Sequence, residues 1–67
     1  MAALSERLIK LRNERNILQK DVAISIDIGL RSYQRYESGE REPTASVLIA
    51  LADYYDVTLD YLVGRPD

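Results

Sequence analysis

Three residues, Asp27-Ile28-Gly29, constrain the fold more than any other feature of the sequence, because they separate two short segments with helical spacing of apolar residues. Aspartate and glycine tolerate the backbone conformations that end a helix, so the interruption predicts a tight turn. A helix is predicted over about residues 19–25 before it, and another is predicted to begin near Leu30 and end at Gly39. The middle of the chain is therefore expected to form two short helices joined by a turn.

Three more helices are predicted by apolar periodicity and by residues that cap helix ends. The first is predicted to begin at Ser5, whose hydroxyl can accept from free backbone N–H groups, and to stop at Asn16. Another is predicted over roughly residues 45–55, and a last short one, capped by Thr58, over residues 59–63. The whole chain is thus expected to be helical.

The length and composition exclude several classes of protein. A chain of 67 residues suffices for one domain, and without cysteine or histidine a disulfide framework, a metal site such as zinc and a histidine-dependent nucleophile are not expected. The longest apolar run, residues 47–52, is far shorter than the roughly 18 residues of a membrane helix, which favours a cytoplasmic protein. Glu40 and Glu42 are paired acids, but they lie on a polar loop without a pocket, a histidine or metal-ligand spacing to support catalysis. Neither an enzyme nor a cofactor site is therefore predicted.

Charge is distributed unevenly along the chain. The net charge of −2 argues against a polyanionic partner, yet the first 41 residues carry eight basic and six acidic side chains, a balance of +2, and the remainder carries −4. If both parts fold together, one surface can be basic while another is acidic. Charges scattered only for solubility are the alternative.

The helix predicted after the turn has two different faces. At about 100° per residue, Tyr33 and Tyr36 lie on one side, and Arg31, Gln34 and Arg35 lie on the opposite half. Tyrosines at this spacing in so small a protein favour the core over a ligand platform, with their hydroxyls reaching water or a backbone acceptor. The arginines and the glutamine suit either a binding surface or an ordinary solvated face, and both interpretations stay open.

A helix held out from a domain by a tight turn fits the major groove of duplex DNA, which is about 12 Å wide. Arginine can donate two parallel hydrogen bonds to guanine, and glutamine can pair with adenine. Gln19 begins the preceding helix, where its amide can hold a phosphate, and Lys20 and Arg41 can contact further phosphates. The arrangement favours double-stranded DNA as the partner.

The stretch QKDVAISIDIGLRSYQRYESGEREP resembles the helix-turn-helix of the Xre/Cro/CI repressors, and LADYYDVTLDYLVGR resembles the two closing helices typical of that family. The resemblance extends from about Leu8 to Arg65. It implies an all-α, compact five-helix, lambda-repressor-like domain over residues 1–67, with the helix-turn-helix at about 19–37 and closing helices at about 45–55 and 59–63.

The resemblance also implies roles for individual residues. Gln19 becomes a phosphate- and base-contacting residue, and Arg41 occupies a loop position that meets the DNA backbone. The base-reading positions and those beside them are occupied by Leu30, Arg31, Ser32, Gln34 and Arg35. An ion pair between Arg12 and Glu37 is implied between the first and third helices.

Four positions depart from the family pattern. Asp27 replaces the usual glycine of the turn, and Leu18 replaces a Ser or Thr cap worth roughly 1 kcal/mol. Gly29 also replaces a Ser or Thr, at the cap of the third helix. Leu30 puts an apolar side chain, able to touch a thymine methyl, at a base-reading position.

Together these features predict a transcriptional repressor that occludes polymerase at a pseudo-palindromic operator. One reading helix covers only a few base pairs, so a homodimer on two half-sites is expected. Its candidate interface residues are Tyr54, Tyr61 and Val63, which alternatively only close the core. The second hypothesis, favoured by the overall acidity, is a protein-interaction module of the same fold, such as a toxin-neutralising antitoxin or an adaptor.

Overall fold

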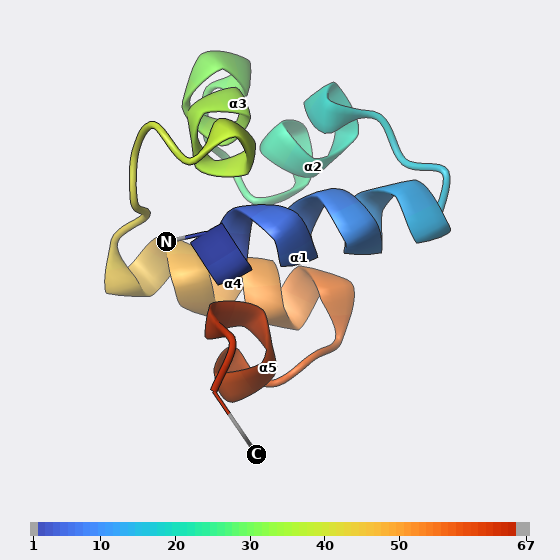
Figure 1. The fold of residues 1–67 in the computed structure, drawn as a ribbon. Coiled ribbons are helices and arrows are strands. Elements are labelled where there is room, and N and C mark those ends of the chain that lie inside the picture. The colour runs from blue at the N-terminus through green and yellow to red at the C-terminus, as the bar shows by residue number, and fades with distance from the viewer. Residues whose placement is uncertain (1, 66–67) are drawn as a thin grey trace.

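Five helices joined by short loops make up residues 2–65, which are the residues that the computed structural model describes. They are α1 (Ala2–Glu14), α2 (Gln19–Ser25), α3 (Leu30–Ser38), α4 (Ala45–Tyr55) and α5 (Leu59–Val63). α1 packs against both α3 and α5, so it lies between the α2–α3 pair and the α4–α5 pair (Figure 1). Residues 2–65 contain no strand, and the predicted all-α fold of five helices is confirmed.

α1 begins earlier than predicted. It starts at Ala2, so Ser5 lies inside the helix and the prediction that Ser5 caps it was wrong. Alanines 2 and 3 are strong helix formers, and the added turn carries Leu4, which is 1% exposed, into the core. The predicted stop agrees with the structure, because α1 ends at Glu14 and Asn16 adopts a left-handed φ of 54°.

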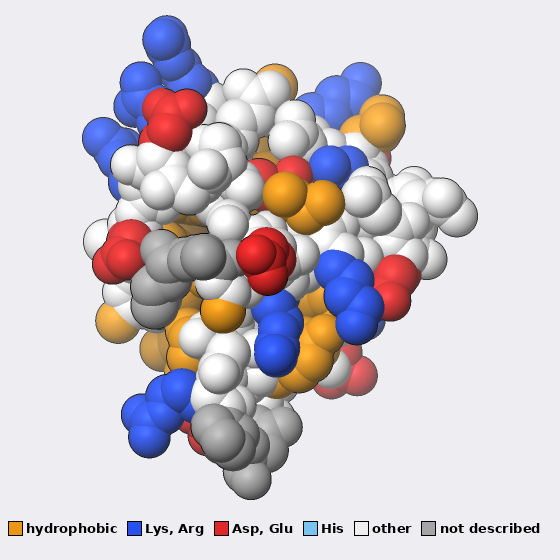
Figure 2. All heavy atoms as spheres, viewed as in Figure 1, with side chains coloured by type: hydrophobic (Ala, Val, Ile, Leu, Met, Phe, Trp, Pro, Cys, Tyr) orange, Lys and Arg blue, Asp and Glu red, His pale blue; other side chains and the backbone are white. Residues whose placement is uncertain are grey.

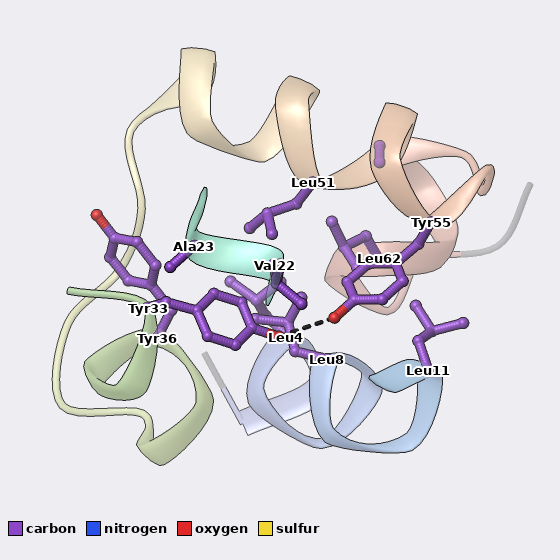
Figure 3. Packing of buried hydrophobic residues seen from close by; sticks show 11 residues of the cluster. Leu4, Leu8, Leu11, Val22, Ala23, Tyr33, Tyr36, Leu51, Tyr55 and Leu62 are labelled. Carbon is purple, nitrogen blue, oxygen red and sulfur yellow. Dashed lines mark hydrogen bonds between the residues drawn. The ribbon is translucent and has the colours of Figure 1, made fainter. Parts of the chain in front are cut away.

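Every helix contributes to one hydrophobic core (Figure 3). Its buried members are Leu4, Leu8, Leu11, Val22, Ala23, Tyr33, Tyr36, Leu51, Ala52, Tyr55 and Leu62. The prediction that Tyr33 and Tyr36 belong to the core is confirmed, since they are 0% and 7% exposed. The Tyr33 hydroxyl was expected to reach water or a backbone acceptor, but it pairs with the Tyr55 hydroxyl at 2.9 Å, because both rings enter the core from opposite sides. The core-facing side of α3 is therefore bonded to α4.

The turn between α2 and α3 depends on Asp27. This residue adopts the left-handed φ of 59° that the turn requires, which aspartate tolerates better than most residues. The N–H of Ile28 donates to the carbonyl of Ala23 over 2.9 Å and satisfies the end of α2. Gly29 has φ −68°, which any residue can adopt, so the backbone does not require a glycine there. The left-handed residue and this hydrogen bond thus end α2 and leave four residues between its last residue and Leu30, where α3 begins.

Candidate nucleic-acid interface

One face of α3 points away from the core. Arg31 and Gln34 are exposed on this face, and Arg35 is half-buried beside them. A hollow of about 280 Å³ opens here, lined by Arg31, Gln34, Arg35, Ser38 and Glu40. Basic side chains gather around α3 at the upper left of Figure 2. We call this hollow and the side chains that line it the outward face of α3.

The two remaining residues with predicted base-reading positions lie at the beginning of the same helix. Leu30 is the first residue of α3 and is 41% exposed, while Ser32 is half-buried. Leu30 is therefore accessible to an apolar group of a partner. The N-cap of α3 is Gly29, which has no side chain and so makes no capping hydrogen bond.

The arginines fall into two groups. Arg7 donates to the carbonyl of Tyr61 and its guanidinium lies 4.2 Å from the centre of that ring, while Arg15 donates to the carbonyl of Tyr55 over 2.8 Å. These two side chains tie α1 to the closing helices, and sequence analysis gave them no role. By contrast, no described residue pairs with the side chains of Arg31 or Arg35. Their donors are available to a partner.

Glu37 connects α1, α2 and α3 through its carboxylate. Arg12 donates from Nε to Glu37 Oε2 over 2.6 Å and from Nη2 to Oε1 over 3.1 Å. Gln19 Nε2 donates to the same Oε1 over 3.1 Å, and Gln34 Nε2 donates to Gln19 Oε1 over 3.2 Å. The structure thus places the predicted pair in a chain of four side chains that reaches the outward face. We call this chain the Arg12–Gln34 relay.

The protonation of Glu37 is set by this environment. Burial by itself raises the pKa of the carboxyl, but hydrogen bonds from Arg12, Tyr33 and Gln19 outweigh burial and lower the pKa below its ordinary value. Arg12 has a raised pKa, first because of its hydrogen bond to Glu37. Both groups are therefore charged at neutral pH.

The start of α2 carries two of the predicted backbone-contacting residues. Gln19 is half-buried because it points toward Glu37 and Gln34, and Lys20 is exposed. Leu18 offers no side-chain cap, as predicted, but the carboxylate of Asp21 accepts from the Leu18 N–H over 3.4 Å, which is the reciprocal bond of a capping box. Arg41 lies on the exposed loop after α3, and its N–H donates to the carbonyl of Arg35 over 3.4 Å.

Two residues of the hollow were missed by sequence analysis. Ser38 Oγ lies 3.1 Å from the carbonyl oxygen of Arg35 and 3.3 Å from Glu40 Oε1, and its single proton can be donated to either acceptor. The Glu40 carboxylate lines the same hollow as Arg31 and Arg35. The signal in the sequence was weak, because Glu40 lies beyond the helix and only the path of the loop brings it back.

The candidate interface residues on the closing helices are all half-buried. Tyr54 packs edge-on against Tyr55, with ring centres 5.0 Å apart, and Tyr61 is covered by the Arg7 guanidinium. Val63 lies at the end of α5.

None of the helices in residues 2–65 has both the length and the apolar character of a membrane-spanning helix. No group of acidic side chains in that range is arranged to hold a metal ion.

Comparison with known proteins gives a consistent result. The helix-turn-helix family model matches residues 8–62. The chain is 42% identical to the cryptic phage CTXphi transcriptional repressor RstR of Vibrio cholerae serotype O1, over 92% of this chain and 55% of that protein. It is 40% identical to the HTH-type transcriptional regulator AnsR of Bacillus subtilis, over 90% of this chain and 52% of that protein. The chain spans about half the length of these curated relatives.

A solved structure is similar along nearly all of this chain. The crystal structure of a transcriptional regulator from Listeria innocua superimposes with a TM-score of 0.88 at 31% sequence identity. The match covers 96% of this chain and 60% of that one. The similarity therefore includes all five helices rather than the central pair alone.

Proposed function

This chain belongs to the helix-turn-helix family, and on that premise we propose that it binds double-stranded DNA sequence-specifically and regulates transcription. The observation that carries the proposal is the contrast among the arginines. Within residues 2–65, no side chain pairs with Arg31 or Arg35 on this face, whereas Arg12 is paired with Glu37 between α1 and α3. Major-groove readout of guanine needs guanidinium donors that are free to bond to O6 and N7 of the base, and this helix face offers two such groups.

The proposal assigns separate roles to two sets of side chains. Base readout belongs to Leu30, Arg31, Ser32, Gln34 and Arg35 on α3. Contacts with the phosphate backbone belong to Gln19, Lys20 and Arg41, which lie on either side of this helix in the sequence. Base contacts specify a sequence and phosphate contacts position the protein, so the two sets differ in what their loss would do.

Repression is the mode of regulation that we propose. Relatives named as repressors support it, and a small domain bound over a promoter can exclude polymerase. We propose the cytoplasm as its location, because the relatives come from bacteria, whose DNA lies in the cytoplasm. The proposal requires no catalytic step, cofactor or metal.

Two copies of the chain on a pseudo-palindromic operator complete the proposal. One reading helix covers only a few base pairs, and two half-sites about 10 base pairs apart raise both affinity and selectivity. Tyr54, Tyr61 and Val63 are the proposed interface. Sedimentation at micromolar concentration, with and without DNA, tests this, and a monomer under all conditions would refute it.

Selection of bound duplexes from a random pool, followed by titration against salt, tests the function itself. We expect one sequence to be enriched, with an affinity that falls steeply as salt concentration rises, because phosphate contacts release counterions. Failure to enrich any sequence, together with an absence of salt-dependent binding, would contradict the proposal.

A protein-interaction role is the second candidate, and one observation favours it. A groove of about 490 Å³ lies between α4 and the turn after α2, lined by Ser25, Ile26, Asp27, Ala50, Asp53 and Tyr54. Its carboxylates would repel DNA, and Ile24, next to it in sequence, is 75% exposed. A partner there would be apolar and basic. The salt titration separates the two candidates, since a protein-only module binds no duplex.

A further inference from the structure

The groove between α4 and the turn after α2 has an apolar floor, which we define as its half-buried lining residues. These are Ile26, Ala50 and Tyr54. Ile26 and Tyr54 also pack against the hydrophobic core, and Ala50 lies one helical turn before Tyr54 on α4. The core behind the floor therefore fixes its shape before any partner binds.

The rim of the groove is acidic. Asp27 from the turn and Asp53 from α4 are exposed, and the lining contains no lysine or arginine. Among the described residues, no cation pairs with either carboxylate. The position of Asp27 is fixed by the turn, because its φ is 59° and its N–H donates to the carbonyl of Ile24 over 3.2 Å. Two carboxylates from different elements thus accompany one apolar floor.

Apolar surface continues beside the groove. Ile24 is 75% exposed and Ile49 is 50% exposed, and each is next in sequence to a lining residue of the groove. Neither belongs to the hydrophobic core or to the side chains packed against it. One exposed isoleucine is ordinary, but two beside an apolar groove enlarge the surface that a partner would cover.

We propose that this groove is the docking site of a basic amphipathic helix that belongs to a different protein. Charge complementarity selects this occupant, because lysine or arginine beside an apolar helical face would meet the carboxylates of Asp27 and Asp53. The apolar face itself would lie on the floor, as amphipathic helices do in grooves of this kind. Phosphates of a nucleic acid or of a lipid surface would instead be repelled.

A second copy of the chain fits this groove poorly. Basic side chains gather around α3 (Figure 2), and contact between α3 of one copy and the groove of the next would be head-to-tail. Such contacts extend into rings or open chains rather than close as a two-fold dimer. The groove also shares no lining residue with the outward face of α3. The inference therefore goes beyond the proposed DNA binding and does not depend on it.

Selection from a displayed library of random peptides, with the whole chain as the target, provides the probe. The peptides have about 16 residues, long enough for roughly four helical turns. We expect enriched peptides to repeat leucine or isoleucine at helical spacing and to carry lysine or arginine beside that face. Enrichment of acidic or uniformly polar peptides, or of none, would overturn the proposal.

Neutral variants of the rim then locate the binding of a synthetic copy of the enriched peptide. Asp27→Asn keeps a residue that tolerates the left-handed backbone, and Asp53→Asn provides a second variant on an ordinary helical position. Each should weaken peptide binding about two- to fivefold at low salt, as measured by fluorescence anisotropy. Asp56→Asn is the matched control, because Asp56 is also exposed and left-handed, at φ 56°, but lies outside the groove. It should leave the affinity unchanged.

Three other results would overturn the docking site. An equal loss for Asp56→Asn would show attraction to the acidic chain in general, and no loss for Asp27→Asn or Asp53→Asn would place the peptide elsewhere. A change in the sedimentation of the free chain caused by Asp53→Asn would assign the groove to a second copy. Asp53→Asn should bind the enriched duplex as tightly as the wild type does. If the wild type enriches no duplex, the proposed function fails, while the peptide measurements still decide the groove.

Discussion

Arg12 of α1 and Glu37 of α3 are joined by two hydrogen bonds, Nε to Oε2 over 2.6 Å and Nη2 to Oε1 over 3.1 Å. A planar guanidinium and a planar carboxylate that meet in this way restrict each other's orientation as well as their separation. Since Glu37 is 5% exposed, its carboxylate depends on side chains of the protein rather than on bulk water for its hydrogen bonds. The buried side of α3 is thus attached to α1 through a defined pair of side chains.

Removing one side of this pair should be costly. We expect Arg12→Met to lower the free energy of unfolding by about 3 to 5 kcal/mol, because it leaves the Glu37 carboxylate buried without its cation. Urea denaturation measures this. Lys10→Met, on the exposed side of the same helix, is the control and should change stability little. Equal stability of Arg12→Met and the wild type would show that the pair does not hold the helices together.

The same carboxylate predicts a dependence of stability on pH. The pKa of Glu37 is lower in the folded chain than in the unfolded chain, so its stabilising contribution is complete above the unfolded value of about 4.3. It is lost as the pH falls through the lower folded value, where the native carboxylate takes up a proton. Glu37→Gln, although less stable at neutral pH, should therefore show a shallower acid loss than the wild type in thermal melts from about pH 5 to pH 2. Parallel profiles would contradict this assignment.

Two glycines with similar backbone angles should respond differently to alanine. Gly39 has φ +82° and the nearest atom to an added Cβ is Ser5 Oγ at 3.8 Å, whereas Gly64 has φ +84° and Ala3 Cβ would lie only 2.6 Å away. We expect Gly39→Ala to cost about 1 kcal/mol for the left-handed backbone. Gly64→Ala should cost about 1 to 3 kcal/mol more, because α1 and α5 must separate. Calorimetric melts that shift equally for both variants would rule out the close approach.

The Glu40 carboxylate should oppose DNA binding. It lines the same hollow as Arg31 and Arg35 and would face phosphates or acceptor edges of the bases. We expect Glu40→Gln to strengthen duplex binding by a few tenths to about 1 kcal/mol at low salt, with a smaller gain at high salt. Fluorescence anisotropy at two salt concentrations measures this. A loss of affinity would instead assign Glu40 a direct role in recognising the duplex.

The sequence predicts most of this fold because its signals are local. Asp27 and the caps at Thr44 and Thr58 act within one turn of the chain, and the helices after each of them begin where periodicity places them. The start of α1 was wrong because Ser5 has the chemistry of a cap, while the packing of Leu4 into the core decides the outcome. At the start of α1, the packing of Leu4 into the core thus outweighs the capping preference of Ser5.

The site was less predictable than the fold. A helical wheel separates Arg31 and Arg35 from the tyrosines, but it cannot show that Gln19 and Gln34, 15 residues apart, meet at 3.2 Å. Nor can it show that Arg7 and Arg15 are occupied with backbone carbonyls on the closing helices. Side-chain contacts between elements depend on how those elements pack, which one-dimensional spacing does not encode.

The central claim, that the outward face of α3 reads DNA sequence, is tested most directly by comparing Arg35→Ala with Arg41→Ala on the enriched duplex and on single-base variants of it. Arg35→Ala should cost about 1 to 3 kcal/mol and lose discrimination at one base pair, whereas Arg41→Ala should weaken every duplex by the same factor. Uniform losses for both variants across all sequences would contradict the account.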